Sequence, residues 1–422
     1  MMNRTLLSIA SRNVVRYGKR TVITAIVLMF GLACFIFFDS LLAGMDRMTI
    51  DAMTDYTASS IIIRTAEYQK NHRGLPLDYG IDAPEKLIED LKQTAPEASG
   101  ITPRALFAGN ASNRIESIPI LGTVVDPFRD ATVFRIRDAV KQGSWLSPGI
   151  EEKTAVLGIT VAQDLGLSVG DYFLLSARTT DEATNADEFK IVGIVDVPAP
   201  EINQGGVFIS FDNAREFLGS NLPVTEIDIA LPRQPSIDAG MKKAGEAALK
   251  IAQRHPDLAT ISIADTAKDY MAMRAMKSKF SSIVILVVLL IAGVGIVNTI
   301  LMSIYSRIKE IGVLRAYGME ARHIRRLFSL EGIMIGTVGS LGGALLGALL
   351  VWWASTSGIP LDMFLGKISV GSIPLAGTLY GEWHIGTFIF SIAFGILASW
   401  FSARIPAKKA ASLEVTEALR FI

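Results

Sequence analysis

The apolar residues of the 422-residue chain gather into four long runs that are almost free of charge. These runs cover residues 21–45, 277–303, 327–354 and 385–403, and the second is uncharged from Phe280 onward. A helix that spans a bilayer needs about 20 predominantly apolar residues. Each run is therefore predicted to form a transmembrane helix. The first run exceeds the apolar core of a cleaved signal peptide, which favours a retained signal-anchor helix.

Lysine and arginine are concentrated in three segments that flank these runs. Residues 1–20, 304–326 and 404–422 are rich in bases, whereas residues 355–384 contain a single one. Cytoplasmic segments next to spans carry an excess of Lys and Arg. We therefore expect both termini and the middle loop to be cytoplasmic, with a helix at the N-terminus. The large segment 46–276 and the short loop are then expected on the outer side.

The outer segment alternates between β-branched apolar runs and amphipathic stretches. This pattern predicts an α+β domain, interpreted as two lobes with one inserted in the other. Asp212 is expected to cap one of its helices. The predicted strands are Ser60–Arg64, Ser117–Val125, Tyr172–Ser176, Phe189–Val195, Val207–Ser210 and Glu226–Leu231. The predicted helices are Pro84–Thr94, Thr160–Leu165, Asp212–Leu218 and Ser236–Arg254.

Composition and motifs exclude several classes of function. Half of the residues are apolar and 41 basic residues balance 41 acidic ones, which excludes a disordered chain and gives no net attraction to nucleic acid. Cys34 is the single cysteine, so no intrachain disulfide can form. The four histidines lack metal-ligand spacing, and neither a G-x-S-x-G elbow nor a G-x-x-x-x-G-K-[ST] loop occurs. We expect no metal, cofactor or catalytic centre, so a partner must supply any energy.

The loop between the second and third runs mixes apolar and charged residues at helical spacing. Ile308, Ile311, Val313 and Leu314 lie among charges and predict a short amphipathic helix that ends at Gly318. Periodicity leaves two interpretations open. One is a helix in the membrane interface with snorkelling arginines, and the other is a docking surface for a soluble partner.

Short motifs spread along the chain carry a resemblance to a known family. They are Ala10–Arg16, Arg20–Thr21, Val156–Asp171, Phe189–Ile194, Glu310–Gly318, Leu327–Gly332, Ile405–Leu413 and Glu417–Arg420. Together they resemble the ABC-transporter permeases of the MacB/LolC/LolE/FtsX superfamily, which work by mechanotransmission. The order of the motifs matches the four predicted spans. The layout is most similar to that of LolC/LolE-like lipoprotein-release permeases.

The resemblance implies a permease that works as a dimer, with an identical copy or a paralogue, and with two copies of a separate ATPase that binds ATP and Mg²⁺. In this family the loop after the second span carries a coupling helix that docks on the ATPase. ATP-driven closure would then move the first two spans and the outer domain. The residues expected to couple are Glu310, Ile311, Gly312, Leu314, Arg315 and Gly318.

The chain departs from the family pattern at two points. MacB carries a fused ATPase, which this sequence does not contain. LolC and LolE have Asn-Gly-Phe after the first span, where this chain has Leu41–Met45. An outer segment of this length is more similar to LolC, LolE or a MacB-type permease than to FtsX.

Small residues recur at four-residue steps along the third run, a pattern that lets transmembrane helices approach closely. The predicted helix-packing positions are Gly332, Gly336, Ser340, Gly343 and Gly347.

Two acidic residues stand out in the apolar runs. Glu331 is expected to be solvated or paired with Arg322, Arg325 or Arg326. Asp39 is either a functional acid in the membrane or an acid that snorkels to the outer surface.

Methionines flank the outer ends of the first two runs, and methionine adapts to irregular apolar partners. The hypothesis is an access path for an acyl chain or another apolar substrate, and the alternative is ordinary stalk packing. The residues concerned are Phe35, Phe38, Met45, Met48, Met273, Met276 and Phe280.

The leading functional hypothesis is a permease subunit that releases lipoproteins or other amphiphiles from the inner membrane of a double-membraned bacterium. Membrane lipid and a periplasmic carrier or adaptor would be further partners. The alternatives are a MacB-like efflux permease and an FtsX-like transmembrane activator of a cell-wall hydrolase. A membrane-anchored enzyme has the least support, because no catalytic constellation occurs in the sequence.

Overall fold

The computed structural model describes residues 9–10, 12, 18–147, 152–360 and 378–412. The chain divides into two compact units. The first comprises Met1–Asp46, Met273–Pro360 and Thr378–Ile422, and the second comprises Arg47–Ala272 and Leu361–Gly377.

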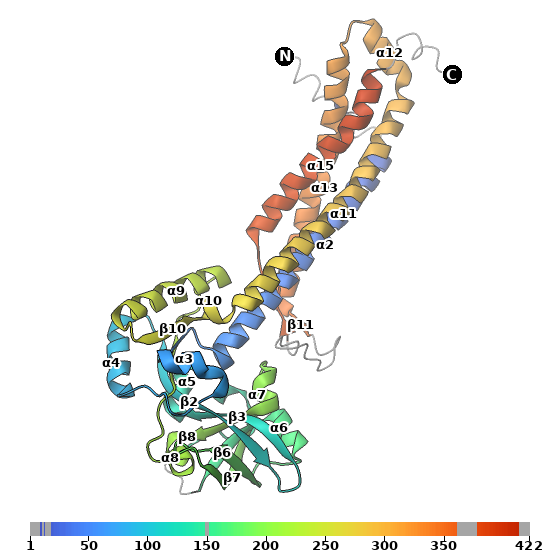
Figure 1. The fold of residues 1–422 in the computed structure, drawn as a ribbon. Coiled ribbons are helices and arrows are strands. Elements are labelled where there is room, and N and C mark those ends of the chain that lie inside the picture. Colours follow the sequence, from blue (N-terminus) through green and yellow to red (C-terminus); the bar gives the residue numbers. More distant parts are fainter. Residues whose placement is uncertain (1–8, 11, 13–17, 148–151, 361–377, 413–422) are drawn as a thin grey trace. The chain divides into compact units, whose positions relative to one another are not determined.

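The first unit is helical (Figure 1). Among the described residues, three helices are long and apolar enough to cross a membrane: Thr21–Thr57, Ala321–Ser357 and Ile385–Lys409. The remaining predicted span lies within a fourth long helix, whose segment Gly293–Ser306 is also apolar. The helices are α2 (Gly18–Ala52), α11 (Lys268–Ser306), α12 (Ile308–Ala316), α13 (Ala321–Ser357) and α15 (Ile385–Ala411). A two-stranded antiparallel pair, β11 (Ile359–Pro360) and β12 (Thr378–Leu379), follows α13.

Polar contacts join α2 to α11 within this unit. The hydroxyls of Thr24 and Thr299 form a hydrogen bond of 2.5 Å. Nearer the other end of α2, Asp46 and Arg274 form an ion pair with an O–N distance of 3.0 Å. These contacts hold the first two predicted spans side by side.

The second unit is built on a mixed sheet in the order β10-β1-β9-β2-β3-β8-β5-β7-β4, with β6 pairing to β2 and β7. Most neighbours are antiparallel, but β3 with β8 and β5 with β7 are parallel. The strands are β1 (Ile61–Thr65), β2 (Gly100–Ser112), β3 (Ser117–Val125), β4 (Val140–Gly143), β5 (Thr154–Gly158), β6 (Tyr172–Arg178), β7 (Thr184–Val195), β8 (Gly206–Ser210), β9 (Glu226–Ala230) and β10 (Leu258–Ser262).

Helices of one to five turns connect these strands. A π-helical segment, η1 (Met53–Thr57), follows α2, and two 3-10 turns are η2 (His72–Gly74) and η3 (Arg137–Ala139). The α-helices are α3 (Ala66–Asn71), α4 (Pro84–Thr94), α5 (Pro127–Val133), α6 (Ile159–Asp164), α7 (Pro200–Gly205), α8 (Phe211–Leu218), α9 (Ile237–Arg254) and α10 (Ile263–Thr266).

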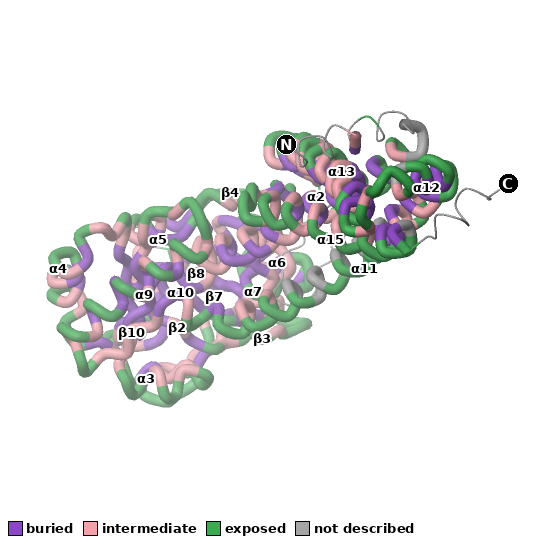
Figure 2. Tube along the Cα trace, turned by 90° about the horizontal axis from the view of Figure 1, so that it is seen from above, coloured by how far each residue is buried: buried purple, intermediate pink, exposed green. Residues whose placement is uncertain are grey.

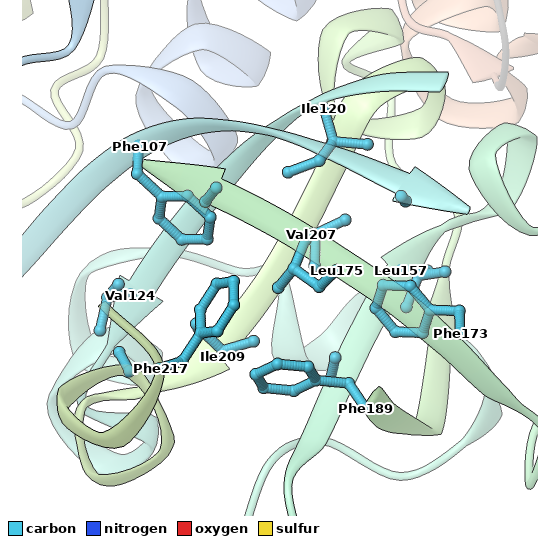
Figure 3. Close-up of a cluster of buried hydrophobic side chains, with 14 of the residues drawn as sticks. Phe107, Ile120, Val124, Leu157, Phe173, Leu175, Phe189, Val207, Ile209 and Phe217 are labelled. Atoms are coloured by element: carbon cyan, nitrogen blue, oxygen red, sulfur yellow. The ribbon is translucent and has the colours of Figure 1, made fainter. Parts of the chain in front are cut away.

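The buried apolar side chains of this unit form separate clusters. One contains aromatic rings from β2, β6, β7 and α8, with Phe189 and Phe217 packed edge to face at 5.3 Å (Figure 3). A second gathers isoleucines of β1 and β9 beneath α4 and α9. Figure 2 shows buried residues concentrated around β2, β7 and β8, with exposed residues on the periphery. The strands and the inward faces of the helices thus build the core together.

Several predicted elements are confirmed and others are wrong in detail. The strand Ser117–Val125 and the helix Pro84–Thr94 have the predicted bounds. Asp212 does not cap its helix. The Ser210 hydroxyl instead accepts the backbone N–H of Asn213, so Asp212 lies in the first turn. Strands β2, β4, β5 and β10 were not predicted.

Candidate functional site

The short helix α12 links α11 to α13 in the first unit. It begins after Arg307 and ends at Ala316, with Gly318 at a φ of +90°. A left-handed backbone is costly for residues with a Cβ, so glycine suits this turn. The Gly318 N–H donates to the Arg315 carbonyl at 3.0 Å, which closes the end of the helix.

A buried ion pair anchors the start of α12 to α13. Arg307 Nη1 lies 3.1 Å from Glu331 Oε1, and each side chain is only 6% exposed. Arg307 Nε also donates to Glu310 Oε2 at 3.0 Å. Removing one partner of such a pair leaves a buried charge uncompensated. The contact therefore fixes the position of α12 relative to α13.

The expected partners of Glu331 were wrong. Arg322, Arg325 and Arg326 precede Glu331 on the same helix by nine, six and five residues, which places them about 120–180° around the axis from it. Arg322 pairs instead with Glu320, with Nη2 donating to Oε1 at 2.8 Å. The base that contacts the inward-facing Glu331 is Arg307, which comes from another element.

Apolar packing supports this ion pair. The buried cluster beneath α12 unites side chains from α11, α12, α13 and α15, and the Arg307 guanidinium lies 6.0 Å from the Phe328 ring centroid. Arg315 Nη1 donates to the Ala411 carbonyl at 2.7 Å. The cluster comprises Ile296, Ile300, Ile304, Ile311, Ile324, Phe328, Ala403 and Ala407.

The opposite side of α12 is exposed and partly apolar. Lys309, Val313 and Tyr317 follow one another at four-residue steps, with Val313 44% and Tyr317 89% exposed. A large aromatic side chain left this open is typical of a contact surface. The sequence predicted Val313 only as an apolar position of the helix and did not single out Tyr317, although their spacing from Lys309 signals a common face.

The structure separates the residues expected to couple into two groups. Ile311 and Gly312 are buried and Arg315 is half-buried. Glu310 and Gly318 are exposed, so they share the accessible side. The Leu314 side chain lies outside the described residues.

The predicted packing glycines of α13 face two different helices. A Cβ added at Gly332 would lie 2.3 Å from Ala403 Cβ, and one at Gly336 would lie 2.5 Å from Ser399 Cβ, both on α15. On the other face, Gly343 and Gly347 pack against α2, where an added Cβ would lie 3.0 Å from Leu32 Cβ and from Ile36 Cβ, respectively.

Ser340 belongs with the α15-facing glycines, because Gly395 of α15 packs directly against its side chain. This contact is fully buried. One face of α13 therefore meets α15 and the other meets α2.

The residues of the hypothetical substrate path differ in accessibility. Phe38 and Met276 are strongly exposed, and Met273 is 37% exposed. Phe35 packs partly against Leu28 and Leu32. Met45 and Met48 are half-buried, and the Phe280 side chain lies outside the described residues.

Asp39 takes polar partners from the start of α15. The Thr387 hydroxyl donates to Asp39 Oδ2 at 2.6 Å, and His384 Nδ1 lies 3.5 Å from the same oxygen. The acid thus joins the outer ends of two spans. Within the described part of the chain, no group of three or more His, Cys, Asp or Glu side chains is placed to hold a metal ion.

The second unit contains a buried charge network between β1, β9 and β2. Arg104 Nε donates to Asp130 Oδ1 at 2.7 Å, and Arg64 Nη2 donates to Glu226 Oε2 at 2.7 Å. Asp228, beside them on β9, accepts from the Ser59 hydroxyl at 2.9 Å. Burial raises the pKa of Asp228 well above its usual value, and the charge of Glu226 raises it further.

Two family descriptions match consecutive parts of the chain. Residues 21–246 match the MacB-like periplasmic core domain, and residues 282–415 match the FtsX-like permease C-terminal region. A multi-pass membrane protein with a periplasmic α+β domain is the class that these matches and the fold define. The chain belongs to the FtsX/MacB superfamily of ABC-transporter permeases.

Individual relatives are more distant. An uncharacterised ABC transporter permease of Methanocaldococcus jannaschii is 25% identical over 67% of this chain and 65% of its own length. The lipoprotein-releasing system transmembrane protein LolE of Haemophilus influenzae is 24% identical over 79% of this chain and 80% of its own. The macrolide export ATP-binding/permease protein MacB of Shigella boydii is 31% identical, but over only 33% of this chain and 19% of its own length.

Proposed function

We propose that this permease couples ATP hydrolysis by a separate ATPase to movement of its periplasmic domain, and that it thereby releases lipoproteins or other amphiphiles from the inner membrane. Two copies of the ATPase and a second permease copy or paralogue complete the complex, and both permease termini are cytoplasmic. The observation that carries the coupling proposal is the two-sided character of α12. One side is fixed by the buried Arg307–Glu331 pair, and the other exposes Val313 and Tyr317.

Because α12 is anchored to its neighbours, force on α12 would be transmitted to the helices that it contacts. Displacing α12 strains the Arg307–Glu331 contact and the shared apolar cluster, so the force is passed on to α11 and α13. The first of these, α11, continues without a break from Ser306 back to Lys268. Packed cores transmit displacement because they have few voids to absorb it. A push at α12 is therefore delivered along α11 toward the periplasmic domain.

The choice of cargo rests on the relatives. The LolE match extends over four-fifths of both chains and includes periplasmic and membrane regions, whereas the MacB match covers a third of this chain. Exposed Phe38, in the outer half of the first predicted span, and Met276, just before the second, give an acyl chain apolar contacts. Both observations favour an amphiphilic cargo over macrolide efflux.

The coupling proposal is tested with V313D and Y317A in the full-length permease. Each change removes apolar contact area from the exposed side, so co-purification of the ATPase should fall about tenfold or more, with an unchanged melting temperature. Y305A on α11 is the matched control, because Tyr305 is 44% exposed but lies outside α12. Full ATPase recovery with both α12 variants would refute the docking role.

The cargo proposal needs a separate measurement. The reconstituted permease–ATPase complex should release a triacylated lipoprotein from proteoliposomes when ATP is added, and an unacylated version should not compete. A photo-crosslinker at position 276 should capture the acylated protein. Release without dependence on acylation, or ATP-driven movement of a macrolide instead, would overturn the assignment while leaving α12 docking intact.

A further inference from the structure

A cavity of about 70 Å³ lies within the second unit, where the last turns of α2, the loop before α9 and the first turns of α9 meet. Its floor is apolar, with Ile50, Met241, Ala244 and Ile263 all buried. The cavity therefore has room for a compact group such as a phosphate.

Positive charge dominates the polar part of the lining. The lining contains three bases, Arg47, Arg233 and Lys243, and one acid, Asp51. Asp51 is shared, because its Oδ2 lies 3.7 Å from Arg47 Nε and 3.4 Å from Arg233 Nη1. Arg233 also pairs with Asp55 beyond the lining. Asp55 is shared in turn, because Arg135 Nε lies 3.6 Å from its Oδ2.

Lys243 is the third base of the lining. Among the described residues its ammonium has no hydrogen-bond or ion-pair partner, although the side chain is half-buried beside the cavity. Arg47, by contrast, donates to the carbonyls of Pro235 at 2.8 Å and Gln234 at 3.1 Å. These hydrogen bonds hold its side chain against the loop before α9, where it forms part of the cavity wall. An ammonium without a protein partner gains a charge-assisted hydrogen bond from an anionic ligand in the cavity.

We propose that this cavity binds the headgroup phosphate of an anionic phospholipid from the periplasmic leaflet, with the glycerol backbone against the apolar wall. Arg47, Ile50 and Asp51 belong to α2, the helix that contains the first span, and Arg47 follows the end of that predicted span by two residues. The apolar floor favours a phosphate that carries apolar substituents over free phosphate. This inference is independent of the cargo and of ATPase docking.

Two glycines of α9 provide a matched pair of variants. A Cβ added at Gly240 meets nothing closer than 3.9 Å, and Gly240 lines the cavity, so G240L fills it without an initial clash. A Cβ added at Gly245 meets nothing within 4 Å, and Gly245 lies outside the lining. The neighbouring Lys242 is an internal reference, because its exposed side chain is absent from the lining.

The experiment measures acetylation of lysines in the full-length protein in dodecyl maltoside, read by mass spectrometry. Dihexanoyl phosphatidylglycerol at ten times its half-effective concentration should slow labelling of Lys243 about tenfold and leave Lys242 unchanged. G245L should keep this protection and G240L should lose it, with equal melting temperatures without lipid. Inorganic phosphate and dihexanoyl phosphatidylcholine at the same concentration should protect weakly.

Each other result contradicts the inference. Equal protection by inorganic phosphate would identify a site for free anions, and equal protection by phosphatidylcholine would remove the preference for net negative lipid. Equal protection of Lys242 would indicate adsorption to mixed micelles. Absence of protection, or protection that persists in G240L, would show that the cavity does not hold the headgroup.

Discussion

Asp39 and Glu331 show how single charged residues behave in the apolar helices of this permease. Both take partners from other elements: Asp39 from Thr387 on α15, and Glu331 from Arg307 at the start of α12. A charge away from water is tolerated when it is paired and hydrogen-bonded. The sequence identified both acids as unusual. It did not identify their partners, because these depend on which faces of separate helices meet.

The Arg307–Glu331 pair gives a prediction for the stability of the membrane unit. R307M should destabilise it by about 3–5 kcal/mol, because the buried Glu331 carboxylate loses its contact with Arg307, and E331M should cost less, because Arg307 keeps its contact with Glu310. The double variant should recover most of this loss, since it leaves no buried charge. Thermal unfolding in detergent measures the three variants. E320Q is the control and should cost less than about 1 kcal/mol, because the Arg322–Glu320 pair is exposed. Additive losses in the double variant would contradict the coupling.

The charge network around Asp228 predicts a pH dependence. Asp228 is buried beside Arg64, Arg104 and Glu226, and its raised pKa means that the folded protein keeps a proton that the unfolded chain has lost. The free energy of unfolding should therefore fall as the pH rises from about 4, by up to about 1.4 kcal/mol per pH unit until the raised pKa is reached. D228N should flatten this slope in melting temperatures measured from pH 5 to 8. An unchanged slope would show that another group sets it.

At the scale of elements, prediction succeeded where one signal dominated. Three of the four apolar runs lie in helices that can cross a membrane, and the amphipathic helices α4 and α9 were predicted, because charge and apolar spacing agree over many residues. The strand β2 was missed because Pro103, Gly109 and Asn110 are typical of turns rather than strands. In the fold, β2 pairs with β3, β6 and β9, so its tertiary partners override the local preference.

The small residues of α13 give a prediction at this scale. G336A should destabilise the helical unit by about 1–3 kcal/mol, because the new methyl group overlaps Ser399 and forces α13 away from α15. G386A on α15 is the matched control, because a Cβ there meets nothing within 4 Å. It should be neutral or stabilising by up to about 1 kcal/mol through helix propensity. Equal melting temperatures of the two variants in detergent would show that the close approach is unimportant.

At the scale of the whole molecule, the helices divide by what they connect. Helices α2 and α11 lead into and out of the segment between Arg47 and Ala272, whereas α13 and α15 are joined to each other through residues 358–384. Sequence order alone predicts this division. Which residues of α12 are accessible could not be predicted, because Ile311 and Val313 are similar side chains with opposite exposure that only packing determines.

This division predicts which pair of helices must slide. If the periplasmic segment moves with ATP hydrolysis, α2 has to shift relative to α13, while α13 and α15 can stay together. A C34S background removes the single cysteine, and L32C/G343C then places a disulfide between α2 and α13, where the Cβ positions lie 3.0 Å apart. Because disulfides join Cβ atoms about 3.8 Å apart, a small adjustment closes the bond.

Oxidation of L32C/G343C should abolish ATP-driven release of cargo in proteoliposomes, and reduction should restore it. S340C/G395C is the matched control, with its Cβ positions 3.3 Å apart between α13 and α15, and its oxidation should leave release intact. Mobility on gels verifies both bonds. Full activity of the oxidised α2–α13 pair would mean that the periplasmic segment moves while its first span stays in place. Because α2 is continuous from Gly18 to Ala52, this result would contradict the proposed mechanism.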